Sequence, residues 1–232
     1  MIDFGRFSHL TFDCYGTLID WETGILNAVT PLLARHRIAA EPAEVLALYA
    51  RHEAAAEAGP YRPYREVLCA TLRALAAELG CEPAADELDV LPNSLGRWPP
   101  FPDTIESLRW LKARYRLVIL SNIDDDLFAG TARQLQVQFD AVITAQQVRS
   151  YKPALVHFRT ALDRLGASPR QLLHVAQSLY HDHAPAKRLG FTTVRVNRPS
   201  RLAGTGVSLP AEARPDFEVP DLWSLVELIQ RH

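Results

Sequence analysis

The sequence predicts an α/β protein whose core is a doubly wound, Rossmann-like parallel sheet with an inserted all-helical cap. Two observations support this fold class. After residue 103, short apolar strands alternate with amphipathic helices, the order that builds a right-handed parallel sheet. Between residues 18 and 98 the apolar residues recur with helical periodicity, and no strand-like run occurs. We therefore expect a core formed by residues 1–17 and 99–232, and a separate helical cap formed by residues 18–98.

The first expected element is a short apolar strand over residues 9–12. It leads into FDCYGTLID, residues 12–20, where Asp13 directly follows the apolar run and a glycine allows a tight turn. In an open parallel sheet, ligands bind at the carboxyl ends of the strands. Asp13 is therefore the first candidate for chemistry.

The expected cap contains at least two amphipathic helices. One is predicted over residues 41–58, because Pro42 lies near its start and Gly59 just past its end. A second is predicted over residues 64–79, where one apolar stripe precedes a terminating glycine. Three prolines in the stretch WPPFPD, residues 98–103, then forbid regular structure and mark the return to the core.

The second core segment repeats strands and helices. Asp103 and Glu106 predict a helix start of the capping-box type. The apolar run RLVIL, residues 116–120, predicts a parallel strand that is covered on both faces. Residues 141–144, 172–176 and 192–196 repeat this pattern and predict three further strands. Residues 197–215 have the composition of a loop, to which the sequence assigns no role.

Four polar residues follow the predicted strands. Asp13, Ser121, Lys152 and Asp182 each lie beyond a strand, and the last three recur at the length of a strand–helix–strand unit, about thirty residues. Such groups converge at the carboxyl edge of a parallel sheet. The interval between Asp13 and Ser121 is longer because it contains the cap, which we expect to cover the crevice and to exclude water.

The composition excludes several classes of function. An apolar content of 48% and a charged content of 22% are those of an ordinary globular protein. A formal net charge of −2 argues against nucleic acid as a partner. The three cysteines have no zinc-like spacing, and no stretch is long and apolar enough for a signal peptide or a membrane span. We expect a cytoplasmic protein with a small-molecule partner and no membrane partner; a homodimer stays open.

Four motifs resemble those of a known family. FDCYGTLID (12–20), LSN (120–122), YKP (151–153) and Asp182 before KRLGF are similar to the motifs of the haloacid dehalogenase superfamily. The resemblance is closest to its 2-haloacid dehalogenase branch and extends over essentially the whole chain, cap included. It implies a hydrolase that forms an aspartyl ester with a small 2-substituted carboxylic acid.

The resemblance also implies a role for each candidate residue. Asp13 matches the nucleophile, and a carboxylate of ordinary pKa is ionised at neutral pH without a helper base. Lys152 matches the lysine that keeps this carboxylate ionised. The remaining expected roles are a hydrogen bond to Asp13 from Thr17, orientation of Lys152 by Asp182, and binding of the nucleophile or the substrate carboxylate by Ser121 and Asn122.

Two positions argue against a phosphatase and against a metal. Phosphatases of the superfamily carry an aspartic acid at position 15 to protonate a departing alkoxide. This chain has Tyr15 there, which suits a halide, because halide leaves without a proton. Gln177 stands where a magnesium-binding carboxylate is expected. We therefore expect no metal and no cofactor, with Tyr15 and Gln177 near the substrate, and we expect His181 and His183 to be solvated or helix-start residues rather than zinc ligands.

The chain also departs from the dehalogenase pattern. Phe158 replaces a tyrosine, and the arginine that grips the substrate carboxylate from the cap has no certain match. Arg51 is the nearest candidate, with Arg62 and Arg65 as rivals. Two alternatives to the dehalogenase-like hydrolase therefore remain: a Mg²⁺-dependent small-molecule phosphatase of the same superfamily, and a non-catalytic protein that binds small acids.

Overall fold

A six-stranded parallel sheet forms the centre of the protein. The computed structural model describes residues 3–200 and 211–231. The strands follow the order β3-β2-β1-β4-β5-β6 across the sheet. Their bounds are β1 His9–Phe12, β2 Arg116–Ser121, β3 Ala141–Thr144, β4 Leu172–Ala176, β5 Thr192–Val196 and β6 Phe217–Val219. The predicted doubly wound fold is confirmed, and β1, which ends at Asp13, lies in the middle of the sheet.

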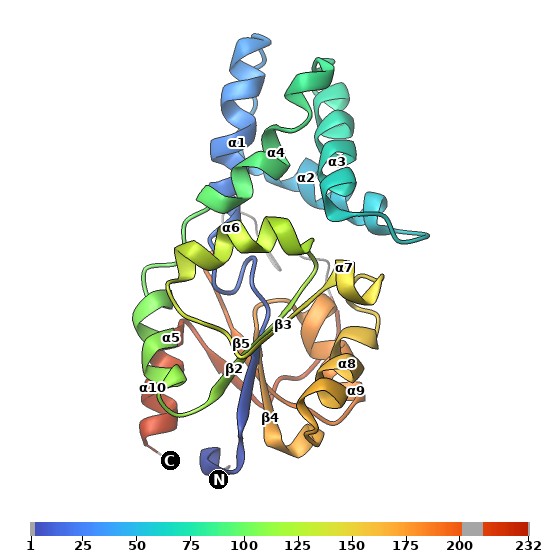
Figure 1. Ribbon diagram of the computed structural model, residues 1–232. Coiled ribbons are helices and arrows are strands. Elements are labelled where there is room, and N and C mark those ends of the chain that lie inside the picture. Colours follow the sequence, from blue (N-terminus) through green and yellow to red (C-terminus); the bar gives the residue numbers. More distant parts are fainter. Residues whose placement is uncertain (1–2, 201–210, 232) are drawn as a thin grey trace.

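Alternate residues of the strands pack against helices on opposite faces of the sheet. Leu117 and Ile119 of β2 pack on one face with α5 (Thr104–Lys112), α6 (Asp125–Leu135) and α10 (Leu222–Gln230). Val118 and Leu120 pack on the other with α8 (Val156–Leu165) and α9 (Ala184–Arg188). Figure 1 shows these helices on the two sides of the sheet, with α7 (Ala145–Val148) near its upper edge.

The inserted helices stand above the carboxyl ends of the strands (Figure 1). They are α1 Trp21–Arg35, α2 Pro42–Glu57, α3 Tyr64–Glu78 and α4 Val90–Ser94, with short 3₁₀ turns at Ala85–Glu87 and Leu95–Arg97. The helices expected over 41–58 and 64–79 are thus present. Ile19 pairs with Pro100 in an isolated antiparallel bridge, so the chain leaves the core and returns to it at neighbouring points. The division into 1–17, 18–98 and 99–232 stays a prediction.

The capping box predicted at Asp103 is wrong, although the helix begins at the expected place. The Asp103 side chain caps no backbone N–H of α5. Its buried carboxylate instead accepts two hydrogen bonds from Arg198 Nη1, at 2.7 and 2.8 Å, and one from the backbone N–H of Leu222 at 2.6 Å. A buried guanidinium is a stronger partner for a carboxylate than a neutral backbone amide.

Strand β6 was not expected. It has only three residues, which are half-buried, exposed and buried in turn, and it pairs with one neighbour, β5. Such a short edge strand lacks the apolar run that marks a central parallel strand. Part of the expected loop over 197–215, residues 201–210, lies outside the described residues. No helix in the described part of the chain is both long and apolar enough to span a bilayer.

Candidate active site

Asp13 lies on the floor of a pocket at the carboxyl edge of the sheet. The turn after β1 places Gly16 at φ 86°, a left-handed conformation that glycine adopts without strain. This turn brings the Thr17 hydroxyl back to Asp13, where Oγ1 donates to Oδ2 over 2.7 Å. The predicted contact between these two side chains is therefore present.

Lys152 connects two carboxylates beneath the pocket. Its side chain is 2% exposed. Nζ lies 2.8 Å from Asp13 Oδ1, 2.7 Å from Asp182 Oδ1 and 2.9 Å from the carbonyl oxygen of Leu120. An ammonium has three N–H groups, so each of them has an acceptor here. The structure thus brings together Asp13, Thr17, Lys152 and Asp182, the four residues that the sequence singled out for catalysis.

The charges of this group settle its ionisation. Burial by itself lowers the pKa of Lys152, but Asp13 and Asp182 outweigh burial and raise it, so the ammonium stays charged. Burial by itself raises the pKa of Asp182, but Lys152 and His174 outweigh it and lower the pKa. Burial raises the pKa of Asp13, with Lys152 acting against the increase. The pKa of Asp182 is thus lowered and that of Asp13 raised, so Asp13 is the more basic of the two carboxylates.

A chain of buried side chains holds Asp182. His174 Nε2 lies 3.1 Å from Asp182 Oδ1, and His174 Nδ1 lies 2.9 Å from Thr11 Oγ1. Of the two expected placements, solvated or at a helix start, His183 takes the second: it is the N-cap residue of α9 and is fully buried, with Nε2 2.9 Å from the carbonyl oxygen of Ala176. His181 is half-buried and lines the pocket. Among the described residues, no three His, Cys, Asp or Glu side chains form a group that could hold a metal ion.

Ser121 and Asn122 both line the pocket, but they differ in their contacts. Asn122 Oδ1 accepts from the backbone N–H of Lys152 over 2.7 Å, and Nδ2 donates to the backbone carbonyl of Lys152 over 3.2 Å. Asn122 therefore fixes the backbone that carries the lysine. Ser121 is 1% exposed, and its hydroxyl has no hydrogen-bond partner in the described part of the chain.

Tyr15 presents its ring, rather than its hydroxyl, to the pocket. The hydroxyl lies 2.7 Å from Thr131 Oγ1 of α6, and the ring meets Trp98 edge-on at 5.8 Å between centroids. Burial raises the pKa of Tyr15 well above its usual range, so the phenol is neutral. A neutral hydroxyl paired with Thr131 does not replace the acid that the resemblance associates with phosphatases.

Gln177 and Phe158 lie outside the pocket that contains Asp13. Gln177 lines an adjacent pocket beside Arg198, and its backbone N–H donates to Thr17 Oγ1 over 3.0 Å. Its link to Asp13 therefore runs through Thr17. Phe158 is buried in the core, where its ring packs edge-on against His174 at 5.2 Å between centroids.

Arg51 was expected to reach the substrate, but its side chain lies at the surface of the cap, away from the pocket. The Arg51 guanidinium is 57% exposed and forms an ion pair with Glu78. Arg62 donates to the backbone carbonyl of Ala56, and Arg65 pairs with acidic residues at the surface. Arg51 lies two positions before Glu53, and residues two apart on an α-helix point in nearly opposite directions. The face of α2 that meets the core is therefore the face that carries Glu53, opposite Arg51.

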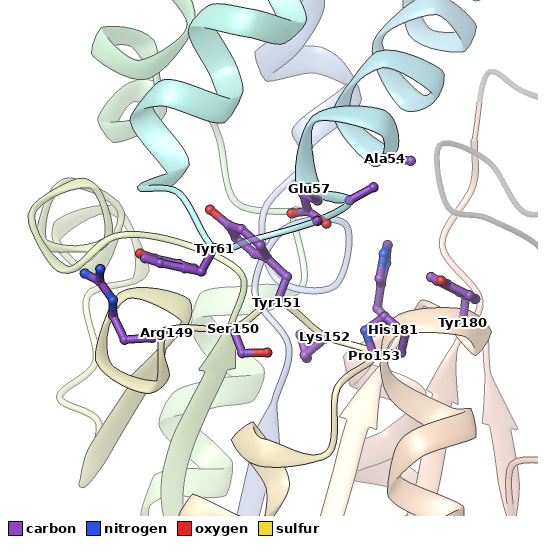
Figure 2. A pocket seen from close by; sticks show the side chains of 12 residues that line it. Ala54, Glu57, Tyr61, Arg149, Ser150, Tyr151, Lys152, Pro153, Tyr180 and His181 are labelled. Atoms are coloured by element: carbon purple, nitrogen blue, oxygen red, sulfur yellow. The ribbon is translucent and has the colours of Figure 1, made fainter.

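That face carries two residues that the sequence reasoning missed, Glu53 and Glu57. Both line the pocket above Asp13, together with Trp21 and Tyr64. Figure 2 shows Glu57 on the cap side of the adjoining outer pocket, with Lys152 on the core side. The inner pocket has a volume of about 40 Å³ and the outer pocket about 260 Å³. The available signal was the spacing of two glutamates four residues apart, which places both on one helical face.

The family follows from a match over most of the sequence. The sequence model of the haloacid dehalogenase-like hydrolases matches residues 7–190. The chain belongs to this family of haloacid dehalogenase-like hydrolases.

Two similar proteins of known activity represent different members of the family. (S)-2-haloacid dehalogenase 4A of Burkholderia cepacia is 29% identical over 193 residues, which cover 81% of this chain and 81% of that protein. A glyceraldehyde 3-phosphate phosphatase of Methanocaldococcus jannaschii is 30% identical over 136 residues, which cover 56% of this chain and 57% of that protein. Both a dehalogenase and a phosphatase of this family are thus relatives, and the dehalogenase matches more of the chain.

A solved structure agrees with this assignment. The L-2-haloacid dehalogenase of Xanthobacter autotrophicus superposes with a TM-score of 0.83 and 25% sequence identity, over 97% of this chain and 98% of that one. The present haloacid dehalogenase-like protein is therefore a hydrolase, and not the non-catalytic binder that the sequence left open.

Proposed function

We propose that this hydrolase breaks a bond between carbon and a good leaving group, such as halide, through an ester on Asp13. One observation carries the proposal. The Asp13 carboxylate faces the pocket with Oδ1 held by Lys152 and Oδ2 held by Thr17, while Tyr15 offers no acid to a leaving group. This arrangement suits a nucleophile acting on a substrate whose leaving group needs no proton.

The proposed reaction has two steps. In the first, an oxygen of Asp13 forms a bond to the substrate carbon, and the leaving group departs with the electron pair of the broken bond. In the second, water attacks the carboxyl carbon of the Asp13 ester, so the product leaves with an oxygen from Asp13. Lys152 stabilises the negative charge that returns to the carboxylate. Asp182 Oδ2, which has no hydrogen-bond partner among the described residues, is available to accept a hydrogen bond from this water.

Mg²⁺ is the cofactor that the phosphatase alternative requires, and the residues present do not fit it. A magnesium ion prefers several oxygen ligands in octahedral geometry. In this site the ammonium of Lys152 lies between the nearest oxygens of Asp13 and Asp182. Gln177, at the position of the expected further carboxylate, lines the adjacent pocket. We therefore propose a reaction that needs no metal, and we derive no step through one.

The proposal is tested by single turnover in ¹⁸O-enriched water with a panel of 2-haloacids, halogenated amines and phosphate esters. The first product molecule is expected to carry ordinary oxygen, and the label is expected to appear in the protein at Asp13, as intact-protein and peptide mass spectrometry would show. Asp13→Asn is the matched control, because an amide has nearly the same shape but cannot displace the leaving group. Label in the first product would mean that water attacks the substrate directly, which would overturn the proposal.

A further inference from the structure

The cap directs two carboxyl groups toward the nucleophile. Glu53 and Glu57 are four positions apart on α2 and both line the inner pocket with Asp13. Glu53 is 8% exposed, and its Oε1 accepts hydrogen bonds from Tyr49, at 2.8 Å, and from Tyr64. Two tyrosines of the cap thus fix the orientation of this carboxyl group.

The inner pocket has an unbalanced charge. Four carboxyl groups line it, and Lys152 is the single lysine or arginine among the described residues that do so. Its ammonium already has Asp13 and Asp182 as partners. Burial raises the pKa of Glu53, and burial together with the charge of Glu53 raises that of Glu57. A second cation in the pocket would satisfy both glutamates, whereas an anion would add to the repulsion.

Aromatic rings surround this acidic pair. Trp21 and Tyr64 line the inner pocket. Tyr61 and Tyr151 line the outer pocket, with their ring centroids 5.4 Å apart, and Figure 2 shows the Tyr151 ring between Glu57 and the Tyr61 ring. Ring faces attract organic cations, and carboxylates add charge-assisted hydrogen bonds. A hard divalent ion would instead need more oxygen ligands than two glutamates supply.

The pocket also contains polar atoms that lack partners. Ser121 and Asp182 are each 1% exposed, and both line the inner pocket. The Ser121 hydroxyl and Asp182 Oδ2 have no hydrogen-bond partner in the part of the chain that the structure describes. A buried polar atom without a partner is costly unless a ligand or water completes its hydrogen bonds. These atoms indicate that the pocket receives a polar ligand.

We infer that the substrate carries an ammonium group, primary or methylated, and that Glu53 and Glu57 bind this group. The substrate carbon that carries the leaving group then faces Asp13. The reaction at that carbon rests on the function proposed above, whereas the binding of the ammonium group does not. The one arginine of the outer pocket, among the described residues, has its guanidinium 4.7 Å from the ring centroid of Tyr61. This residue, Arg149, is thus the one arginine among the described pocket-lining residues that could pair with an acid substrate in the outer pocket.

The inference is tested by isothermal titration of the wild-type protein with small unreactive probes. Ethanolamine and choline are the cations, 3,3-dimethylbutan-1-ol is the neutral counterpart of choline, and L-lactate is the anion. We expect at least one cation to bind about tenfold or more tightly than both the alcohol and lactate. Glu57→Gln and Glu53→Gln should each weaken this binding by roughly tenfold to a hundredfold, because each removes one charged hydrogen-bond partner. Glu44→Gln, an exposed change on the same helix, should leave it unchanged.

Three outcomes would overturn the inference. The first is lactate binding more tightly than either cation. The second is no binding of either cation at millimolar concentration. The third is binding of Mg²⁺ that Glu57→Gln abolishes, which would make the acidic pair a metal site. None of the probes reacts, so these binding results do not depend on the ester mechanism. If the protein forms an ester from a 2-haloacid but binds no amine, the ammonium inference is overturned while the proposed function stands.

Discussion

The ammonium of Lys152 lies 2.8 Å from Asp13 Oδ1, and both side chains are almost wholly buried. The lysine therefore does more than neutralise a surface charge, because its removal would leave two carboxyl groups, Asp13 and Asp182, without their common cation. The pKa of Asp13 is already raised by burial, and the positive charge of Lys152 is the main influence against that rise.

Lys152→Ala should therefore move the pH profile of the reaction. Without the ammonium the pKa of Asp13 rises further, so the ionised nucleophile is formed only at higher pH. We expect ester formation at neutral pH to slow by ~100-fold or more and to recover partly as the pH rises. Rapid-quench measurement of ester formation from pH 6 to pH 9 checks this, with Lys112→Ala as a control away from the site. An unchanged profile would show that Lys152 does not control Asp13.

Thr17→Val should weaken catalysis without removing it. The substitution keeps the shape of the side chain but deletes the 2.7 Å hydrogen bond to Asp13 Oδ2. A hydrogen bond to a charged group contributes about 1.5–3 kcal/mol, so kcat/KM should fall by roughly tenfold to a hundredfold. Thr17→Ser, which retains the hydroxyl, should keep most of the activity. Equal losses in both variants would assign Thr17 a packing role only.

Hydrolytic activity should persist in excess EDTA. The prediction follows from Gln177, which stands where a magnesium-binding carboxylate is expected and lines the adjacent pocket, and from Tyr15, whose hydroxyl is paired with Thr131. The measurement is turnover of a responsive substrate after dialysis against chelator, with and without added Mg²⁺. Loss of turnover in EDTA and its return with Mg²⁺ would favour the phosphatase alternative.

Glu57→Gln should stabilise the ligand-free protein, and more so as the pH rises. The pKa of Glu57 is raised above the ordinary 4.5, so folding favours the protonated form. The unfolded chain ionises first, and the folded state therefore loses stability as the pH rises from about the unfolded value through the folded one. The gain from Glu57→Gln should be small near pH 4 and larger at pH 7, as thermal unfolding would show.

This expectation for Glu57 depends on the charges around it. Burial and the charge of Glu53 on the same helix oppose ionisation and raise the pKa of Glu57, whereas Lys152 and a hydrogen bond from Asn122 favour ionisation. A loss of stability in Glu57→Gln at pH 7, or a gain that does not vary with pH, would show that the favourable contacts dominate.

The buried pair of Asp103 and Arg198 should matter greatly for stability. The Asp103 carboxylate accepts from Arg198 and from the backbone of Leu222, so it joins α5 to the segments after β5 and β6. Arg198→Met should cost about 3–5 kcal/mol, because it leaves a buried carboxylate without its cation. Arg231→Met, which breaks an exposed pair with Glu227, should cost under ~1 kcal/mol. Urea unfolding of the two variants measures the difference, and equal effects would contradict it.

The sheet and the position of Asp13 could be predicted from the sequence because local patterns determine them. The stretches predicted as strands at 172–176 and 192–196 coincide with β4 and β5, since short, mainly apolar or β-branched segments between helices are typical of parallel strands. Asp13 and Lys152 could be placed together because the ends of parallel strands share one edge of the sheet.

The lining contributed by the cap could not be predicted, because it depends on how α2 is rotated against the core. Arg51 was expected to reach the substrate and instead pairs with Glu78 at the surface. Glu53 and Glu57 stand among alanines, so by composition they resemble a solvated helical face. The capping box at Asp103 failed for a related reason, because its partner Arg198 is far away in the sequence.

The bridge between Ile19 and Pro100 has a consequence for how such an enzyme can diversify. One continuous stretch of gene, between these two points, encodes the acidic pair that lines the inner pocket, while Asp13, Lys152 and Asp182 are encoded outside it. Because the two junctions are neighbours in space, an exchange of this stretch between homologous genes leaves the strand pairing of β1 with β2 undisturbed. Selection for a new substrate can thus act on the inserted stretch while the nucleophile and its counter-ions are inherited intact.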